Sequence, residues 1–428
     1  MAENVESSTE TATASGVWGW LRYLGPGLVT ACVVIGPGSI LTSSKVGASD
    51  GFANVWVVVV AVLFMLTYIA LAAKLGVVTG RSTADLVSQR AGRWLAVLIG
   101  LSVFFISAAF QFGNNLGVHS ALVAYVDFDY WVVGINAIMI AFVFGFRNLY
   151  RVVERLMACF VGLMLVSFAV NLWFAKPQVD EMLLGLVPLR GSSEIGLPLL
   201  GLVGTTFVIS AAYYQSYLVR FKGWGEGQLR RGMIDARVGA AIMALITLMI
   251  MSTAAAVLRG RDLGSVSDVA NQLQPLFGEK GRAIFCLGLF SAAFSSFLVN
   301  SMIGGFILSD ALNLGSTPDE RMPRVLTAAV MLVGMFVALY VIKAGVRPVA
   351  AIVAAQAVTV VAAPLMAATL LWLTNVEAVM GVHRNGPVTN LAAGLGLILL
   401  TLMAWYTAAY KVWPEIDKLL QNASGAAG

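Results

Sequence analysis

A Gly-Pro-Gly-Ser run in the first apolar stretch is the part of the sequence whose residue types could do chemistry. Gly36, Pro37, Gly38 and Ser39 stand inside residues 23–44, which contain no Asp, Glu, Lys or Arg. Proline removes a backbone donor and clashes with the preceding helical turn, and glycine lets the chain leave helical geometry. In a membrane such a break is tolerated where it lines a cavity, so the run predicts a discontinuous helix at a substrate site. An ordinary proline kink is the alternative.

Polar residues also occur inside the other charge-free stretches. All 22 Asp and Glu lie outside those stretches, with Asp50 and Asp310 at expected helix ends and Glu154 in an expected loop. Ionisable groups in mid-membrane normally mark a transport path, so the interior candidates here are polar but uncharged. These interior residues are Gln111, Asn114, Asn115, His119, Ser210, Gln215, Ser295, Ser296, Asn300 and Gln356.

His119 and two tyrosines are candidates for coupling or gating, together with Asn114 and Asn115. His119 could carry a proton, and a packed, hydrogen-bonded histidine is the alternative. Tyr213 and Tyr214 could gate a pore, or they could anchor a helix at the membrane interface. Residues 201–212 nearby are rich in small side chains but lack proline, which helix packing also explains.

The elements that must position these residues are membrane helices. Of the 428 residues 59% are hydrophobic and 11% are charged, against about 45–50% and about 25% in soluble domains. Positive membrane loops explain the net charge of +5, so nucleic acid is not an expected partner. Cys32, Cys159 and Cys286 form no Cys-x-x-Cys pair, which indicates neither a disulfide framework nor a zinc site.

Charge-free stretches long enough to cross a bilayer predict an all-α integral membrane protein with eleven transmembrane helices. We expect one transmembrane domain over residues 21–415, a disordered cytoplasmic tail over 1–20 and a C-terminal tail over 416–428. The interruption at 259–282 is expected to contain a short helix. If successive loops lie on alternate sides of the membrane and the N-terminus is inside, 16 of the 27 Lys and Arg lie on the inner side. This excess predicts a multi-pass cell-membrane protein with the N-terminus cytoplasmic and the C-terminus outside. The stretches are 23–44, 51–73, 94–126, 130–146, 156–175, 195–219, 238–258, 283–309, 325–342, 348–376 and 385–410.

Three segments match the motifs of a known transporter family. They are Gly25-Pro26-Gly27, then Gly36-Pro37-Gly38 followed by KVGA at 45–48, and LAAKLGVVTGR at 71–81. Through these segments the chain resembles the natural resistance-associated macrophage protein (NRAMP) family of divalent-metal transporters. The resemblance implies a leucine-transporter-like fold with alternating access and, in most members, proton coupling. It also implies inverted repeats of helices 1–5 (about 23–176) and helices 6–10 (about 195–376), discontinuous helices 1 and 6, and helix 11 at about 385–413.

The family's metal-binding residues do not carry over to this chain. The helix 1 pattern is Asp-Pro-Gly-Asn, and the chain has Gly36, Pro37, Gly38 and Ser39 there. The helix 6 pattern Met-Pro-His aligns with Val208, Ile209 and Ser210, and the acidic pair of helix 3 aligns with Ala108 and Gln111. The helix 10 glutamine is kept as Gln356. We therefore expect neither a family-type metal site nor a resident cofactor.

A site of this composition favours a small organic solute over a metal ion. A dication stripped of water needs fixed negative charge, whereas backbone N–H groups at the start of a half-helix attract a carboxylate. Loss of the Asp at Gly36 and of the Met at Val208 is expected to enlarge the pocket. The expected substrate-binding residues are Gly36, Pro37, Gly38, Ser39, Thr205, Val208, Ser210, Gln356 and Gln111.

Three functions remain open from the sequence. The first is a secondary transporter of a small organic solute, with the lipid bilayer, the solute and a co-transported proton or cation as partners. The second is a transporter of manganese, iron or hydrated magnesium with an altered site that uses Asp50 or Asp310. The third is a non-transporting sensor on a transporter scaffold. An enzyme is not expected, since no nucleophile–base pair, metal ligand set or phosphate loop is visible.

Overall fold

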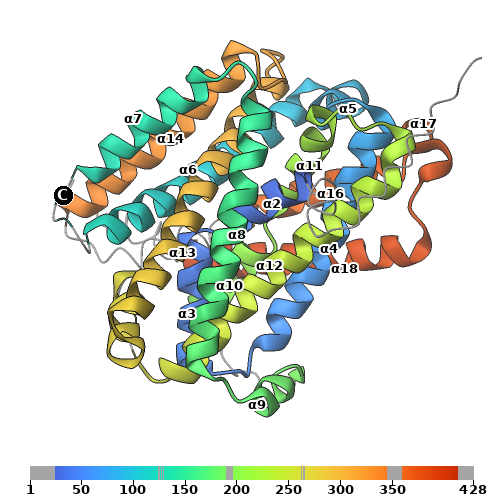
Figure 1. The fold of residues 1–428 in the computed structure, drawn as a ribbon. Coiled ribbons are helices and arrows are strands. Elements are labelled where there is room, and N and C mark those ends of the chain that lie inside the picture. The colour runs from blue at the N-terminus through green and yellow to red at the C-terminus, as the bar shows by residue number, and fades with distance from the viewer. Residues whose placement is uncertain are drawn as a thin grey trace, which may run out of the picture.

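Helices make up the fold throughout the part of the chain that the computed structural model describes. That part comprises residues 25–123, 126, 128, 130–188, 196–261, 263, 266–344 and 359–412. The helices pack side by side as one bundle (Figure 1). The two predicted tails, 1–20 and 416–428, and the predicted site residue Gln356 lie outside the described residues.

The first half of the chain begins with a broken span. Helices α2 (Pro26–Val34) and α3 (Pro37–Asp50) meet at an angle of 57° inside the first predicted stretch. Two short helices, α5 (Thr83–Ala91) and α9 (Val179–Leu184), lie in connections between longer ones. The longer helices are α4 (Val55–Thr79), α6 (Arg93–Val123), α7 (Trp131–Gly145) and α8 (Leu149–Ala175).

The second half also begins with two short consecutive helices, α10 (Leu197–Thr206) and α11 (Ile209–Phe221). The expected short helix in 259–282 is present as the first part of α13 (Val266–Ala311), which breaks at Gly278, where φ is +70°. The other helices are η2 (Glu226–Gln228), α12 (Leu229–Val257), α14 (Arg321–Lys343), η3 (Thr359–Ala362), α16 (Ala363–Leu373), α17 (Glu377–Met380), η4 (Gly381–His383), α18 (Pro387–Thr407) and η5 (Ala408–Val412).

The helix lengths and composition fit a multi-pass membrane protein. Within the described ranges, 7 helices are long and apolar enough to cross a membrane, or up to 9 if each sharply bent pair counts as one span. Helix α7 is apolar but shorter, and α10 and α11 share the sixth predicted stretch. Each of the eleven predicted stretches thus contains helix wherever it is described.

The broken helices occupy the interior of the bundle. Helix α3 packs on α12 and α10, while α2 packs on α12, α8 and α13, and every residue of α2 is buried. In the apolar window of α13 72% of residues are buried, against 28% in α18, so α13 is central and α18 faces outward. The short helices α5 and α17 lie at one end of the bundle and α9 at the other (Figure 1). This arrangement matches the predicted alternation of connections between two sides.

Glu154 departs from its expected place in a loop. It lies in the second turn of α8, and its carboxylate pairs with the ammonium group of Lys222 just past α11. A helix predicted from a stretch without Asp, Glu, Lys or Arg begins only after the last charged residue. The predicted helix is therefore too short wherever the first turns carry charge. Pairing with an opposite charge is what allows such a residue at the margin of a membrane span.

Candidate functional site

The first break lies between α2 and α3, where the chain turns by extended backbone. Gly36 has φ −116° and ψ 179° and precedes Pro37, the first residue of α3. A proline at this position loses no helical bond, because the first N–H groups of a helix have no partner within it. Two polar contacts compensate for the interrupted helix: the N–H of Gly36 donates to the Val34 carbonyl at 3.2 Å, and the Ser296 hydroxyl donates to the Val33 carbonyl at 3.2 Å.

Neighbouring helices close tightly around this break. A Cβ atom on Gly36 would lie 2.8 Å from the Ser296 hydroxyl and 3.2 Å from the Asn114 side-chain oxygen. The expectation that Gly36 enlarges a pocket is therefore wrong for this conformation, because α13 and α6 fill the space. Gly117 of α6 lies against the Pro37 ring, and a Cβ atom there would overlap the ring. The absence of a side chain at Gly117 is what lets α6 approach the break.

The second break lies between α10 and α11, at Phe207 and Val208. Their backbone angles are φ −98°, ψ 66° and φ −82°, ψ 89°, both outside the helical region. The predicted discontinuity of helix 6 is therefore confirmed, although neither residue is a proline or a glycine. The Phe207 ring packs on Phe64 and Tyr68 of α4, with ring centroids 6.0 Å and 5.5 Å apart. Tertiary packing rather than local residue type holds this break.

The halves of the two broken helices pair diagonally. Helix α3, the second half of the first broken helix, is joined to α10, the first half of the second, by Thr42 and Thr205, whose hydroxyl oxygens lie 3.1 Å apart. The other two halves, α2 and α11, are joined by Thr30, whose hydroxyl donates to the side-chain oxygen of Gln215. The breaks therefore lie between two hydrogen-bonded helix pairs, and α6 approaches both of them.

Polar side chains of α6 form a chain of hydrogen bonds beside the first break. Asn114 donates to the side-chain oxygen of Gln111 at 3.2 Å, and Asn115 donates to the Gln111 backbone carbonyl at 2.9 Å. Asn136 of α7 donates to Asn115 at 2.5 Å, a partner that sequence reasoning missed. His119 lies one turn beyond Asn115 on α6 and is half-buried. The structure thus brings Gln111 and Asn114 to the break and ties Asn115 to α7.

Three of the predicted substrate-binding residues have buried polar atoms without a hydrogen-bond partner among the described residues. They are the Ser39 hydroxyl, the Gln111 side-chain nitrogen and the Ser210 hydroxyl, in residues exposed by 2%, 0% and 1%. A buried donor left unpaired costs about 1–3 kcal/mol. Unpaired donors close to two helix breaks are therefore the feature of the interior that fits a polar ligand.

The cavity found beside the second break among the described residues is small. A cavity of about 10 Å³ lies beside the second break, lined by Phe110, Gly204, Val208, Ser210 and Thr359 among others. Such a volume holds about one water molecule. Among the described residues the space beside the second break is thus too small for an organic solute, which would need the helices to move apart.

The predicted gating tyrosines lie in the interior and not at an interface. Tyr213 and Tyr214 of α11 are 0% and 1% exposed. The alternative that they anchor the helix at the membrane interface is therefore wrong. The ring of Tyr214 lies 6.3 Å from both Phe221 and Phe306. Tyr217, one turn further, donates its hydroxyl to the Asp310 carboxylate at 2.6 Å. An aromatic layer therefore covers the side of the break that faces the end of α11.

Asp235 of α12 is an interior carboxylate that sequence reasoning missed. It is exposed by 1%, and its two oxygens accept the N–H groups of Gly25 at 2.8 Å and Gly27 at 2.6 Å. These bonds cap the N-terminus of α2, where no local side chain does so. The only signal in the sequence was the Gly-Pro-Gly start of α2. Its N–H groups have no partner within the helix and require an acceptor from another segment.

No cluster of three or more His, Cys, Asp and Glu able to hold a metal ion occurs within the described ranges. Asp50 and Asp310, the carboxylates considered for an altered metal site, stand at the far ends of α3 and α13. Asp50 accepts a hydrogen bond from Asn54 at 2.6 Å, and Asp310 accepts the one from Tyr217. With about 1.5 Å per residue, Asp50 is on the order of 20 Å along α3 from Pro37. Asp310 is about as far along α13 from Ser296, which lies at the first break. The groups at the breaks themselves are hydroxyls, amides and backbone.

Comparisons with known proteins agree with the fold. The divalent metal cation transporter MntH of Verminephrobacter eiseniae is 27% identical over 378 residues, covering 85% of this chain and 84% of that protein. MntH of Chromohalobacter salexigens is 27% identical over 403 residues, covering 90% of each. The crystal structure of the Eremococcus coleocola manganese transporter has a TM-score of 0.77 at 20% identity and covers 95% of this chain and 90% of that one.

A Na⁺-coupled sialic acid symporter shares the architecture at a lower level, with a TM-score of 0.56 at 13% identity over 89% of each chain. This likeness extends the fold to the wider group of leucine-transporter-like proteins. The family model described as natural resistance-associated macrophage protein-like matches residues 27–409, nearly the whole helical bundle. The chain therefore belongs to the Nramp family of membrane transporters and has a leucine-transporter-like fold.

Proposed function

We propose that the protein is a secondary transporter that moves a small organic solute with a carboxylate or other polar head by alternating access. In this proposal the solute binds between the two helix breaks, at the residues predicted from the sequence. The observation that carries the proposal is the set of unpaired, buried and neutral donors on Ser39, Gln111 and Ser210. They are suited to accept a polar solute without any fixed negative charge beside it.

Two half-helices add their N-termini to these donors. Helix α3 starts at Pro37 and helix α11 at Ile209, both at a break. The first N–H groups of a helix have no partner within it, and the helix dipole makes this end partially positive. Both features favour an anionic or polar group and disfavour a bare cation. The C-termini of α2 and α10 lie at the same breaks and carry the opposite partial charge, so a carboxylate is favoured at the α3 and α11 ends of the breaks in particular.

A divalent cation is the second candidate, because the curated relatives named above are divalent metal cation transporters. A dication normally requires carboxylate, imidazole or thiolate ligands. Gly36, Ser39, Val208 and Ser210 offer none of these, and Asp50 and Asp310 lie about four helical turns away along α3 and α13. We therefore rank this candidate second.

A co-transported ion and the orientation belong to the same proposal. His119 is the histidine within the membrane spans, so it is the residue that we propose carries a coupled proton. The excess of Lys and Arg on one side supports a cytoplasmic N-terminus. A His119→Gln variant that still accumulates solute against a gradient in response to a pH difference would refute this role.

The test compares organic acids with metal ions on purified protein. A thermal-shift screen of small carboxylates, amino acids, Mn²⁺ and Mg²⁺ identifies ligands of the folded state, since such ligands raise the melting temperature. Uptake into proteoliposomes then measures transport of any compound that binds. We expect a shift and saturable uptake with an organic solute and neither with the metal ions. Saturable Mn²⁺ or Mg²⁺ uptake by the unaltered protein would overturn the proposal in favour of the second candidate.

Gly36→Asp tests whether the solute binds at the first break. The new carboxylate would lie beside Ser296 and Asn114 and would repel an anionic head group, so we expect organic-solute uptake to be abolished. Gly36→Ala is the matched control, because it adds the Cβ atom without the charge. Unchanged uptake by Gly36→Asp would contradict this site. Equal loss in both variants would assign the effect to crowding, and Ser39→Ala and Ser210→Ala would then have to weaken binding for the site to stand.

A further inference from the structure

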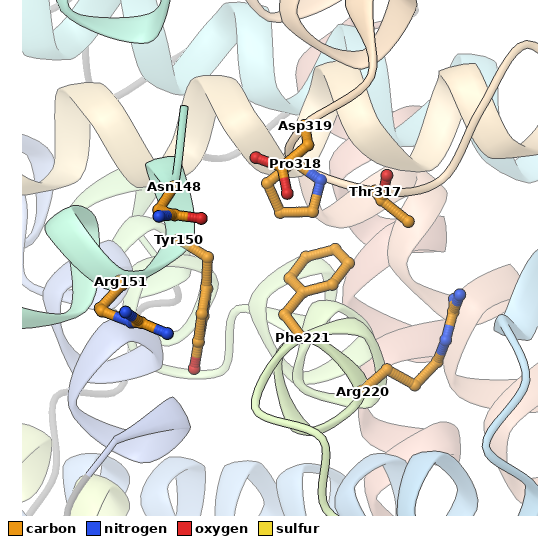
Figure 2. Close-up of a pocket in the computed structure, with 8 residues that line it drawn as sticks. All are labelled: Asn148, Tyr150, Arg151, Arg220, Phe221, Thr317, Pro318 and Asp319. Atoms are coloured by element: carbon orange, nitrogen blue, oxygen red, sulfur yellow. The ribbon is translucent and has the colours of Figure 1, made fainter. Parts of the chain in front are cut away.

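A pocket of about 310 Å³ opens where α8 begins and α11 ends (Figure 2). The first turn of α8 contributes Tyr150 and Arg151, the end of α11 contributes Arg220 and Phe221, and the connection before α14 contributes Asp319. Helix α5 packs on both α11 and α13 at this end of the bundle. In the predicted orientation this end faces the cytoplasm.

The charges around this pocket are mainly positive. Arg151 and Arg220 lie on opposite sides of it (Figure 2). Asp319 is the carboxylate in the lining, and its Oδ1 atom lies 3.4 Å from an Nη2 atom of Arg324, which balances its charge. A concave site with this excess attracts anions and repels dications, because low-dielectric walls concentrate the field.

Two polar atoms at this pocket have no hydrogen-bond partner within the described part of the chain. They are the Nη1 atom of Arg220 and the hydroxyl oxygen of Tyr150, and both are buried. The other terminal nitrogen of Arg220 contacts the Ser316 hydroxyl at 3.4 Å, and the guanidinium carbon lies 5.9 Å from the centroid of the Tyr217 ring. A guanidinium group offers a planar fork that matches a carboxylate or phosphate, and a single donor left without a partner is unfavourable. The unpaired donors therefore point to an anionic ligand.

An aromatic layer separates this pocket from the helix breaks. Tyr150 and Phe221 line the pocket, with ring centroids 5.7 Å apart. Phe221 in turn lies 6.3 Å from Tyr214 and 6.0 Å from Phe306. Ser210 at the second break and Phe221 at the pocket are eleven residues apart on α11, which corresponds to about 16 Å. The pocket is thus one half-helix away from the proposed substrate site, on the other side of the layer.

We propose that this pocket is a binding site for a small anion with a carboxylate or phosphate group, held by Arg220 and Arg151. Its role as the inner vestibule, where an anionic solute waits before the aromatic layer opens, rests on the proposed function. The anion site itself does not, because the unpaired donors and the positive lining are independent of what crosses the helix breaks.

The test measures anion binding in the absence of transport. Protein carrying Gly36→Asp, which silences the central site, is placed in nanodiscs of neutral lipid and titrated with inorganic phosphate and with succinate by calorimetry. We expect saturable binding that weakens about tenfold or more in Arg220→Gln and Arg151→Gln, since each loses a charge-assisted hydrogen bond. Asp319→Asn removes the opposing carboxylate and is expected to tighten binding. Arg155→Gln, an exposed arginine one turn further along α8, is the control and should leave binding unchanged.

The outcomes separate this site from its alternatives. Arg151 is exposed, so Arg151→Gln decides the question even if Arg220→Gln does not fold. Absence of saturable binding, or equal weakening by Arg155→Gln, would overturn the anion site. Loss of phosphate binding in nanodiscs that contain phosphatidylglycerol would assign the pocket to a lipid headgroup and overturn the vestibule. Phosphate binding in a protein that takes up no organic solute would overturn the proposed function and leave the anion site intact.

Discussion

The two helix breaks at the centre of the bundle have related geometry but different causes. At the first break Gly36 is extended and Pro37 starts α3, so the local sequence itself interrupts the helix. At the second break Phe207 and Val208 leave helical geometry without help from proline or glycine. The contacts of Phe207 with Phe64 and Tyr68 of α4 hold the chain there.

This difference shows that a discontinuous helix can be specified in two ways. A break made by Gly and Pro costs little wherever it occurs, since those residues cannot continue a helix well. A break at aromatic and β-branched residues gives up helical bonds that the chain could make, and tertiary contacts must offset that loss. The first kind of break should tolerate changes in its neighbours better than the second. The following variants test this contrast in order of expected effect.

Phe207→Ala should have the largest effect. The ring is 2% exposed, and its removal leaves a cavity against Phe64 and Tyr68 at the point where packing alone sets the backbone. We expect the free energy of unfolding to fall by about 3–5 kcal/mol, as for other buried aromatic truncations. Chemical unfolding of the purified protein in detergent measures this change. Phe105→Ala is the control because that ring is 66% exposed, and an equal loss in both variants would contradict a special role for Phe207.

Gly117→Ala tests the closest approach to the first break. The added methyl group would overlap the Pro37 ring, which is rigid, so α6 has to move away from α3. We expect a destabilisation of about 1–3 kcal/mol, the usual range for overpacking. Gly134→Ala on α7 is the matched control, since nothing lies within 4 Å of its Cβ position. It should be neutral or stabilising by up to about 1 kcal/mol through helix propensity. Similar unfolding curves for the two variants would show that α6 adapts freely.

Ser296→Ala should have a smaller effect at the same break. Its hydroxyl donates to the Val33 carbonyl, which the interrupted helix no longer satisfies. We expect a loss of about 1 kcal/mol, the net value of a typical hydrogen bond. Ser291→Ala on the same helix is the control, because that hydroxyl bonds only to a carbonyl of its own helix, at Leu287. A loss no greater than the control's would mean that the first break needs no support from α13.

The sequence predicted the helices well because apolar length is a local property. Every charge-free stretch contains helix where it is described, and the Gly36-Pro37 break follows directly from residue type. The second break was expected only through the family resemblance. Its cause lies in contacts with α4, far away in sequence, and no local pattern around Phe207 reveals them.

The site was predictable in composition but not in shape. Ser39, Gln111 and Ser210 were predicted to be interior polar residues, and the structure buries all three; their role in binding stays a prediction. The space beside Gly36 could not be predicted, because Ser296 and Asn114 from other helices fill it. Asp235 and Glu154 were missed for a related reason. The buried carboxylate of Asp235 and the half-buried one of Glu154 are compensated by backbone N–H groups and by a lysine from another segment.

The smallest predicted effect concerns the bond that connects α3 and α10, one half of each broken helix. Thr42 and Thr205 contact each other through their hydroxyl groups at 3.1 Å, so each break is linked to the other. Thr42→Val and Thr205→Val keep the shape of the side chain and remove the hydroxyl. In a double-mutant cycle we expect a coupling energy of about 0.5–1 kcal/mol in unfolding, because one neutral hydrogen bond joins the pair.

Thr253→Val combined with Thr42→Val is the control cycle, since the Thr253 hydroxyl bonds to the Met249 carbonyl within its own helix and should not couple to Thr42. Zero coupling between Thr42 and Thr205 would mean that the locally encoded break and the packed break are stable independently. Measurable coupling would mean that the first break, which the local sequence itself favours, stabilises the second. The difference in their causes would then explain why the two breaks occur together. The break at Gly36 and Pro37, set by local sequence, gives the break at Phe207 and Val208 a fixed structure to bond to.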